Sequence, residues 1–145
     1  MATTTHRGFL VAAATTLTTE LNALATATNT AASAVIDNTT TLELYADFDL
    51  VLATQGTARS TGATVALYAT FSLDGTNYAD VLETTAELVG VFSLDPTTTA
   101  RRPASIRDFP ISPGKVKFFA RNVTGQTLAA TGNTISYRLH SITTA

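Results

Sequence analysis

From Thr41 onward, apolar and polar residues alternate with a period of two, and this alternation constrains the fold more than any other feature. In residues 41–52 one side of an extended chain carries Leu42, Leu44, Ala46, Phe48, Leu50 and Leu52. The other side carries Thr41, Glu43, Tyr45, Asp47 and Asp49. Successive side chains of a β-strand point to opposite faces, so the pattern predicts a long, half-buried strand.

The same alternation recurs along the rest of the chain between turn signals. Further strands are predicted at 65–73, 78–82, 87–94, 104–109, 115–122 and 134–142. Asp74-Gly75-Thr76-Asn77 is a strong turn sequence, which makes the strands on either side of it a hairpin. Seven or more short strands with regular turns predict an all-β, antiparallel, jelly-roll-like β-sandwich over residues 41–145.

Residues 1–40 differ from this pattern and are predicted to form an N-terminal arm. Thr and Ala dominate the segment, and Leu17, Leu21 and Leu24 have helical spacing. Because Thr is a poor helix former, a short helix over 18–27 and an extended arm both remain open. With few large apolar groups, the arm must lie on the sandwich or on a neighbouring subunit.

Composition excludes several classes of protein. The 145 residues suit one domain, and charged residues make up 14% against roughly 25% in ordinary domains. A net charge of −2 argues against a nucleic-acid partner, and the absence of Cys excludes disulfides and thiolate metal sites. No apolar stretch is long enough for a membrane-spanning helix, and residues 1–8 do not resemble a signal peptide.

Candidate catalytic groups are scarce. His6 and His140 are the two histidines, and both are interpreted as exposed surface residues. No zinc-binding or nucleophile-elbow spacing occurs, so no enzyme activity, cofactor or metal is expected. Asp47 and Asp49 share a strand face and could hold a hard cation, but a solvated outer face is the favoured interpretation.

Outward aromatic residues and a charge asymmetry suggest contact surfaces. Aromatic rings on a sheet face anchor subunit interfaces or stack on sugars, and without Trp the interface is favoured. Residues 37–95 hold nine acids and one base, whereas residues 101–121 hold six bases and one acid. The two stretches either pair within the chain or form complementary patches between subunits. Interface candidates are Leu17, Leu21, Leu24, Tyr45, Tyr68, Arg101, Arg102 and Phe119.

Four segments carry a resemblance to a known group of proteins. Residues 111–118 (ISPGKVKF) and 121–138 (RNVTGQTLAATGNTISYR) are the strongest. The segments 17–24 (LTTELNAL) and 74–80 (DGTNYAD) fit the same group. The chain resembles small structural proteins of tailed bacteriophages and prophages, from about Leu17 to Tyr137. Ser112 stands where the group usually has a second Pro.

The resemblance implies a non-enzymatic virion protein. Its first expectation is a trimeric capsid decoration (cement) protein that binds the major capsid protein or other virion proteins at the phage capsid surface. Such a protein occupies the host cytoplasm during assembly and binds neither nucleic acid nor membrane. The alternatives are a glycan- or receptor-binding module of a phage fibre, using Tyr45, Tyr68 and Tyr78, and a tail or neck component.

Overall fold

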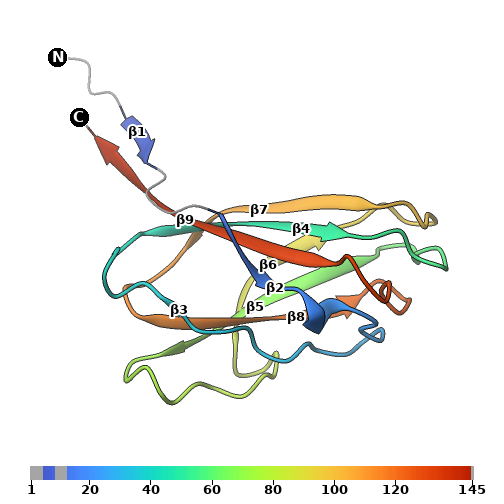
Figure 1. Ribbon diagram of the computed structural model, residues 1–145, viewed down its shortest axis with the longest axis horizontal. Helices are drawn as coiled ribbons and strands as arrows, with labels where there is room; N and C mark the ends of the chain where they lie inside the picture. The colour runs from blue at the N-terminus through green and yellow to red at the C-terminus, as the bar shows by residue number, and fades with distance from the viewer. Residues whose placement is uncertain (1–4, 9–12, 145) are drawn as a thin grey trace.

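The computed structural model describes the backbone of residues 5–8 and 13–144 and the side chains of residues 13–142. These residues form an all-β, antiparallel sandwich, which confirms the predicted fold class (Figure 1). The strands are β1 (Thr5–Gly8), β2 (Ala14–Leu17), β3 (Ile36–Asp37), β4 (Tyr45–Leu52), β5 (Thr64–Ser72), β6 (Glu87–Ser93), β7 (Arg102–Pro110), β8 (Lys115–Val123) and β9 (Thr134–Thr144).

The strands are arranged as a jelly roll. One sheet has the order β1-β9-β4-β7, with β2 also paired to β9, and the other has the order β3-β8-β5-β6. Figure 1 shows β9, β4 and β7 as one layer and β3, β8 and β5 as the layer below. The chain changes sheet at almost every connection, so β4, β7 and β9 become neighbours although they are far apart in sequence.

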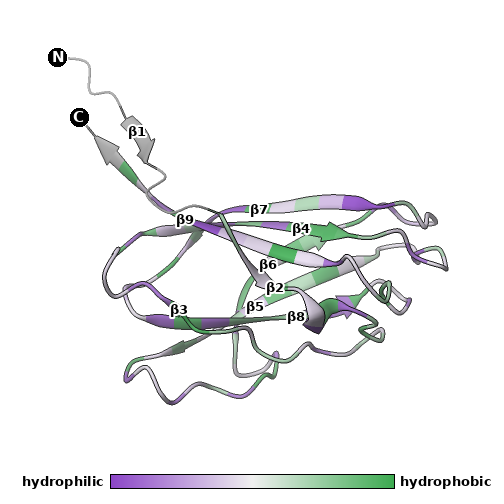
Figure 2. Ribbon diagram, viewed as in Figure 1, coloured by the Kyte–Doolittle hydropathy of each residue, from purple (hydrophilic) through white to green (hydrophobic). Residues whose placement is uncertain are grey.

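The core lies between the two sheets and follows the alternation of the sequence. Hydrophobic and hydrophilic residues alternate along β7, β4 and β9 (Figure 2). Phe48 packs edge-on against Phe118 of the opposite sheet, with ring centroids 4.9 Å apart. The largest fully buried apolar side chains are Phe48, Phe92, Phe118, Phe119, Leu17, Leu21, Leu50, Leu52, Leu67 and Ile135.

The first predicted strand starts later than the alternation indicates. β4 begins at Tyr45, and Leu42 and Leu44 are 53% and 50% exposed. Asn38 causes the difference: its side chain accepts from the backbone N–H of Glu43 at 2.9 Å and donates to the Glu43 carbonyl at 2.8 Å. These bonds hold residues 38–43 in a turn, in which Leu42 has a φ of 51°.

The predicted strand over Tyr78–Leu82 is wrong. These residues belong to the long connection between β5 and β6, and the returning strand is β6. The connection is held to the outer side of its own sheet. Lys117 lies 4.3 Å from the ring centroid of Tyr78, and Arg121 forms an ion pair with Glu83.

β6 also reverses its predicted side-chain pattern near its start. Leu88, predicted to be buried, is 51% exposed, whereas Val89 is buried. The pairing with β5 shifts register between Leu67 and Tyr68, which inserts one extra residue on β6. An extra residue in one strand moves the following side chains to the other face, so the two-residue period breaks at this point.

The N-terminal segment that the structure describes is extended and packs on the sandwich. In place of the helix considered for 18–27, a single 3-10 turn spans Thr19–Leu21. Residues after it run along β8, where Thr30 N–H donates to the Ala120 carbonyl at 2.8 Å. Leu17 and Leu21 lie in the core, so the boundary proposed at residue 40 does not separate an arm from the sandwich.

Candidate functional site

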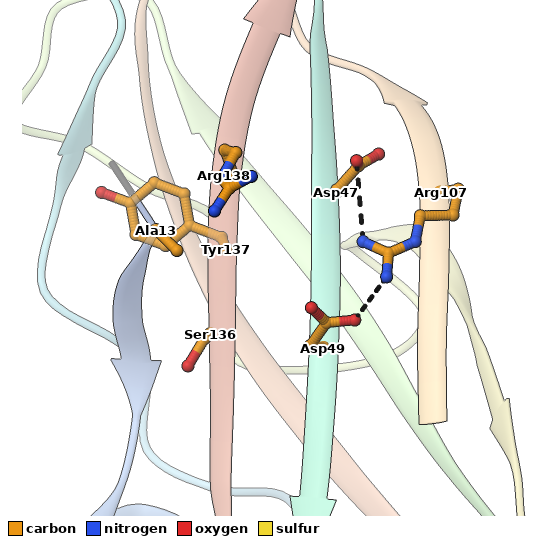
Figure 3. Close-up of a pocket in the computed structure, with 7 residues that line it drawn as sticks. All are labelled: Ala13, Asp47, Asp49, Arg107, Ser136, Tyr137 and Arg138. Carbon is orange, nitrogen blue, oxygen red and sulfur yellow. Dashed lines mark hydrogen bonds and ion pairs between the residues drawn. The ribbon is translucent and has the colours of Figure 1, made fainter. Parts of the chain in front are cut away.

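A polar groove lies on the outer face of the sheet formed by β9, β4 and β7. On each strand, every second residue faces outward, and the pairing of the strands places these residues side by side. Asp47 lies beside Arg138, and Asp49 lies between Ser136 and Ser105. The groove encloses about 360 Å³ and is lined by Ala13, Asp47, Asp49, Arg107, Ser136, Tyr137 and Arg138 (Figure 3). That volume suits one small-molecule-sized group.

Arg107 lies between the two carboxylates of β4. Its guanidinium donates to Asp49 Oδ1 at 2.8 Å and lies 3.6 Å from Asp47 Oδ2 (Figure 3). Ser105 donates to the same Asp49 oxygen at 2.6 Å. A planar guanidinium held by two partners loses little further freedom on binding a ligand, so Asp49, Ser105 and Arg107 form a preorganised polar surface.

The two carboxylates differ in environment. The Asp47 side chain is 7% exposed, and it also accepts from the backbone N–H of Asp108 at 2.9 Å. The Asp49 side chain is 54% exposed, so a ligand in the groove can reach it. The expected solvated face is therefore right for Asp49 and wrong for Asp47.

Tyr137 and Ala13 form the wall of the groove on the β2 side. Figure 3 shows the Tyr137 ring directed away from the carboxylates and towards Ala13. Burial raises the pKa of the Tyr137 hydroxyl above its ordinary value, because charge is disfavoured where water is excluded. The phenol is thus neutral over the physiological range, with one donor and one acceptor beside an apolar ring.

A second cluster lies beside the groove on the same three strands. His140 Nε2 is 3.0 Å from Asp108 Oδ1, and His140 Nδ1 is 3.9 Å from Asp47 Oδ1. Tyr45 stacks on the imidazole with ring centroids 5.6 Å apart. The prediction that His140 is an exposed surface residue is wrong, because its side chain is fully buried. The side chain of His6 lies outside the described residues.

The acidic and basic stretches of the sequence pair with each other within the chain. Four bases of residues 101–121 pair with acids of residues 37–95: Arg102 with Asp95, Arg107 with Asp47 and Asp49, Lys115 with Asp37, and Arg121 with Glu83. These pairs join strands and loops of one molecule. Of the two arginines proposed for an interface, Arg102 forms an ion pair with Asp95, whereas Arg101 is exposed.

The predicted apolar interface residues are mostly internal. Leu17, Leu21 and Phe119 have no exposed surface, and Leu24 packs against the core. Phe119 points outward, as alternation requires, but Tyr68 covers it in a parallel stack at 5.1 Å. These side chains stabilise the fold and are not available to a neighbouring subunit.

The three tyrosines proposed for glycan stacking are each engaged by a neighbour. Tyr45 stacks on His140, Tyr68 stacks on Phe119, and the Tyr78 ring faces Lys117. Tyr45 and Tyr68 are half-buried. The groove and its aromatic residue, Tyr137, lie elsewhere.

Sequence reasoning missed Arg107, Ser136 and Arg138 as site residues. The available signal is strand alternation, which places Ser136 and Arg138 on one face of the predicted strand 134–142 and Arg107 within the predicted strand 104–109. What the sequence does not contain is the order β9-β4-β7, which brings these residues beside Asp47 and Asp49.

No protein-family model and no curated protein matches the chain. The CBM36-1 domain of a multidomain xylanase from the hindgut metagenome of Trinervitermes trinervoides matches with a TM-score of 0.41 and 12% identity, covering 99% of this chain and 97% of that one. CBM32-1 from a family 31 glycoside hydrolase of Clostridium perfringens matches with a TM-score of 0.32 and 16% identity, covering 96% and 94%.

The Yersinia pseudotuberculosis-derived mitogen matches with a TM-score of 0.25 and 9% identity, covering 97% of this chain and 85% of that one. Because all three TM-scores lie below 0.5, function is inferred from the chain's own residues. Within the described residues, no helix has the length and apolar character needed to cross a bilayer.

Proposed function

We propose that this protein is a non-enzymatic module that binds carbohydrate in the groove of the β9-β4-β7 sheet. The observation that carries the proposal is the preorganised group of Asp49, Ser105 and Arg107 on an open sheet face. A sugar presents neighbouring hydroxyls that donate and accept at once. Asp49 accepts from one hydroxyl while Arg107 donates to the next.

The wall of the groove suits the apolar side of a sugar ring. Tyr137 packs partly against the core and contributes part of its ring and a neutral hydroxyl to the groove, and Ser136 adds a hydroxyl on the same strand. Aromatic residues with one polar end contribute contact area and a hydrogen bond together. The groove is shallow and charge-balanced in its lining, with two carboxylates and two guanidinium groups.

A binding role is favoured over catalysis because the histidine whose side chain is described is buried and does not line the groove. His140, the histidine whose side chain is described, is fully buried and contacts Asp108 rather than a hydroxyl nucleophile. Nucleophilic catalysis needs a base within hydrogen-bond reach of the nucleophile and open to substrate. We therefore infer no enzyme activity, and the binding event is the function.

The sequence resemblance supports a place on a tailed-phage virion, as a glycan- or receptor-binding module of a fibre. In that setting the partners are other virion proteins and a host surface glycan. Jelly rolls occur in both lectin and viral capsid domains, so the fold alone does not choose between binding and structural roles. The groove is the feature that a purely structural subunit does not need.

A glycan array tests the proposal directly. The wild-type protein is expected to bind a restricted set of glycans. Asp49→Asn is expected to lose at least about tenfold in affinity, since a hydrogen bond to a charged group contributes about 1.5–3 kcal/mol. Asp37→Asn is the matched control, because Asp37 pairs with Lys115 at the other sheet. No array signal, or equal binding by Asp49→Asn, would remove the proposal.

The second candidate is the capsid decoration protein, proposed as a homotrimer that binds the major capsid protein. It is favoured by the resemblance and by exposed apolar side chains on and near β6, namely Leu82, Leu88 and Val91. Apolar surface of this kind is typical of protein contacts. Two measurements separate the decoration protein from the first proposal: light scattering over a range of salt concentrations, and binding to empty capsids. A decoration protein requires an oligomer that persists at high salt, or binding to the capsid.

A further inference from the structure

The described residues contain one group of His and acidic side chains close enough to share a metal ion. Asp47, Asp108 and His140 each place one ligand-type atom within 4.8 Å of the other two. They come from β4, β7 and β9, so three strands of one sheet position them. We propose that this cluster is a divalent-cation site of zinc type. It shares Asp47 with the groove, but the proposal does not depend on carbohydrate binding.

The three side chains lie close enough for a rearrangement to form a coordination sphere. Zinc binds imidazole nitrogen and carboxylate oxygen at about 2.0–2.2 Å, so ligand atoms of a tetrahedral site lie about 3.3 Å apart. One ligand-type atom from each residue lies within 4.8 Å of the other two. Asp108 Oδ1 is 3.0 Å from His140 Nε2, and Asp47 Oδ1 is 3.9 Å from His140 Nδ1. Because a cation binds one ring nitrogen, one of the two carboxylates turns towards that nitrogen when the ion binds.

The burial of the His140 imidazole and the exposure of the Asp108 side chain both suit a bound cation. The imidazole is fully buried under Tyr45, which fixes its orientation. The Asp108 side chain is 43% exposed, which leaves solvent a route to a further coordination position. A site with three protein ligands and one open position is a common arrangement for zinc.

Neighbouring groups hold the first carboxylate in place. Asp47 Oδ1 accepts from the backbone N–H of Asp108, and Asp47 Oδ2 lies 3.6 Å from Arg107. Such outer contacts orient ligands and contribute to affinity.

The ligand set also indicates which cation. One imidazole with two carboxylates suits zinc and its transition-metal neighbours, whereas calcium and magnesium prefer oxygen ligands alone.

Isothermal titration of the full chain with zinc chloride tests the site. The expected result is one zinc per chain, much weaker calcium binding, and at least a tenfold loss of zinc affinity in Asp108→Asn. Asn tolerates the left-handed backbone of residue 108 (φ 56°), so this variant should fold, which circular dichroism checks. Asp80→Asn, in an exposed loop, is the control and should bind zinc normally.

Three results would overturn the proposal. These are no zinc binding at millimolar concentration, unchanged affinity in folded Asp108→Asn, and loss of binding in His6→Asn, the chain's other histidine. The last result would assign the zinc to a different site. Glycan binding by the groove is unaffected by each of these outcomes.

Discussion

Single buried asparagines tie the loops of this protein to its strands. Asn122 is fully buried, donates to the carbonyls of Leu24 and Gln126 at 2.8 Å each, and accepts from the backbone N–H of Thr124. Asn38 plays the same part for the turn before β4. Both residues begin Asn-X-Thr sequences, yet their amide groups are occupied inside the fold and are closed to modification.

Asn122→Ala should therefore be among the most destabilising single substitutions. It removes one of two donors from the carbonyls of Leu24 and Gln126 and the acceptor of the Thr124 backbone N–H. The expected loss is about 2–4 kcal/mol in the free energy of unfolding. Urea denaturation measures it. Asn77→Ala, in the exposed turn after β5, is the control, with an expected loss of at most about 1.5 kcal/mol. Equal losses would show that burial of the amide is unimportant.

The turn at Asp74 makes stability depend on pH. Hydrogen bonds from the backbone N–H groups of Asn77 and Thr76, and from the side chains of Asn77 and Ser72, hold the pKa of Asp74 well below its ordinary 3.8. A carboxyl whose pKa is lower in the folded state stabilises the protein above its unfolded pKa and loses that contribution as pH falls through the folded pKa.

Asp74→Ala should lower the thermal midpoint at pH 7, and the gap to wild type should narrow as the pH falls below about 4. Thermal unfolding at pH 7 and at pH 2.5 measures both gaps. A gap of constant size across this range would contradict the assignment, because the lost contacts would then not involve the charged carboxylate.

At the scale of elements, strand alternation predicted most of the fold and failed at identifiable places. β4, β5, β7, β8 and β9 lie where the period-two pattern indicates. The errors fall where one hydrogen-bonding side chain or one inserted residue interrupts the pattern: Asn38 before β4 and the register shift in β6. Periodicity reports regular pairing and carries no information on such local exceptions.

In the N-terminal segment, the spacing of apolar residues also failed to predict the local structure. Leu17, Leu21 and Leu24 have helical spacing, yet Leu17 pairs in a strand with Ile135 and Leu21 follows in a 3-10 turn. Tertiary packing, with both side chains fully buried, outweighs a weak local preference in a Thr-rich stretch. The segment is thus an integral part of the sandwich.

Leu21→Ala should cost about 2–5 kcal/mol in the free energy of unfolding, and deletion of residues 1–40 should prevent folding of the remainder. Leu24→Ala, at a partly buried position, should cost less. Chemical denaturation compares the two variants, and the tertiary circular dichroism signal tests the deletion. A truncated chain with native stability would show that the segment is a separate arm.

At the scale of the whole molecule, jelly-roll topology creates the groove. Asp49, Arg107 and Ser136 are separated by tens of residues in the chain and become neighbours because β4 lies between β7 and β9. Alternation along each strand predicts that Asp49 and Ser136 face outward, but not that they lie beside each other and beside Arg107. The proposed tyrosines are not among the residues that line the groove.

The most direct measurement of the central claim is a nitrogen–proton NMR titration of the protein with the best glycan from the array. The largest shift changes are expected at Asp49, Ser105, Arg107, Ser136 and Tyr137, and Asp49→Asn should abolish them. Shift changes confined to the β5–β6 connection around Tyr78, or none at millimolar sugar, would contradict carbohydrate binding in the groove.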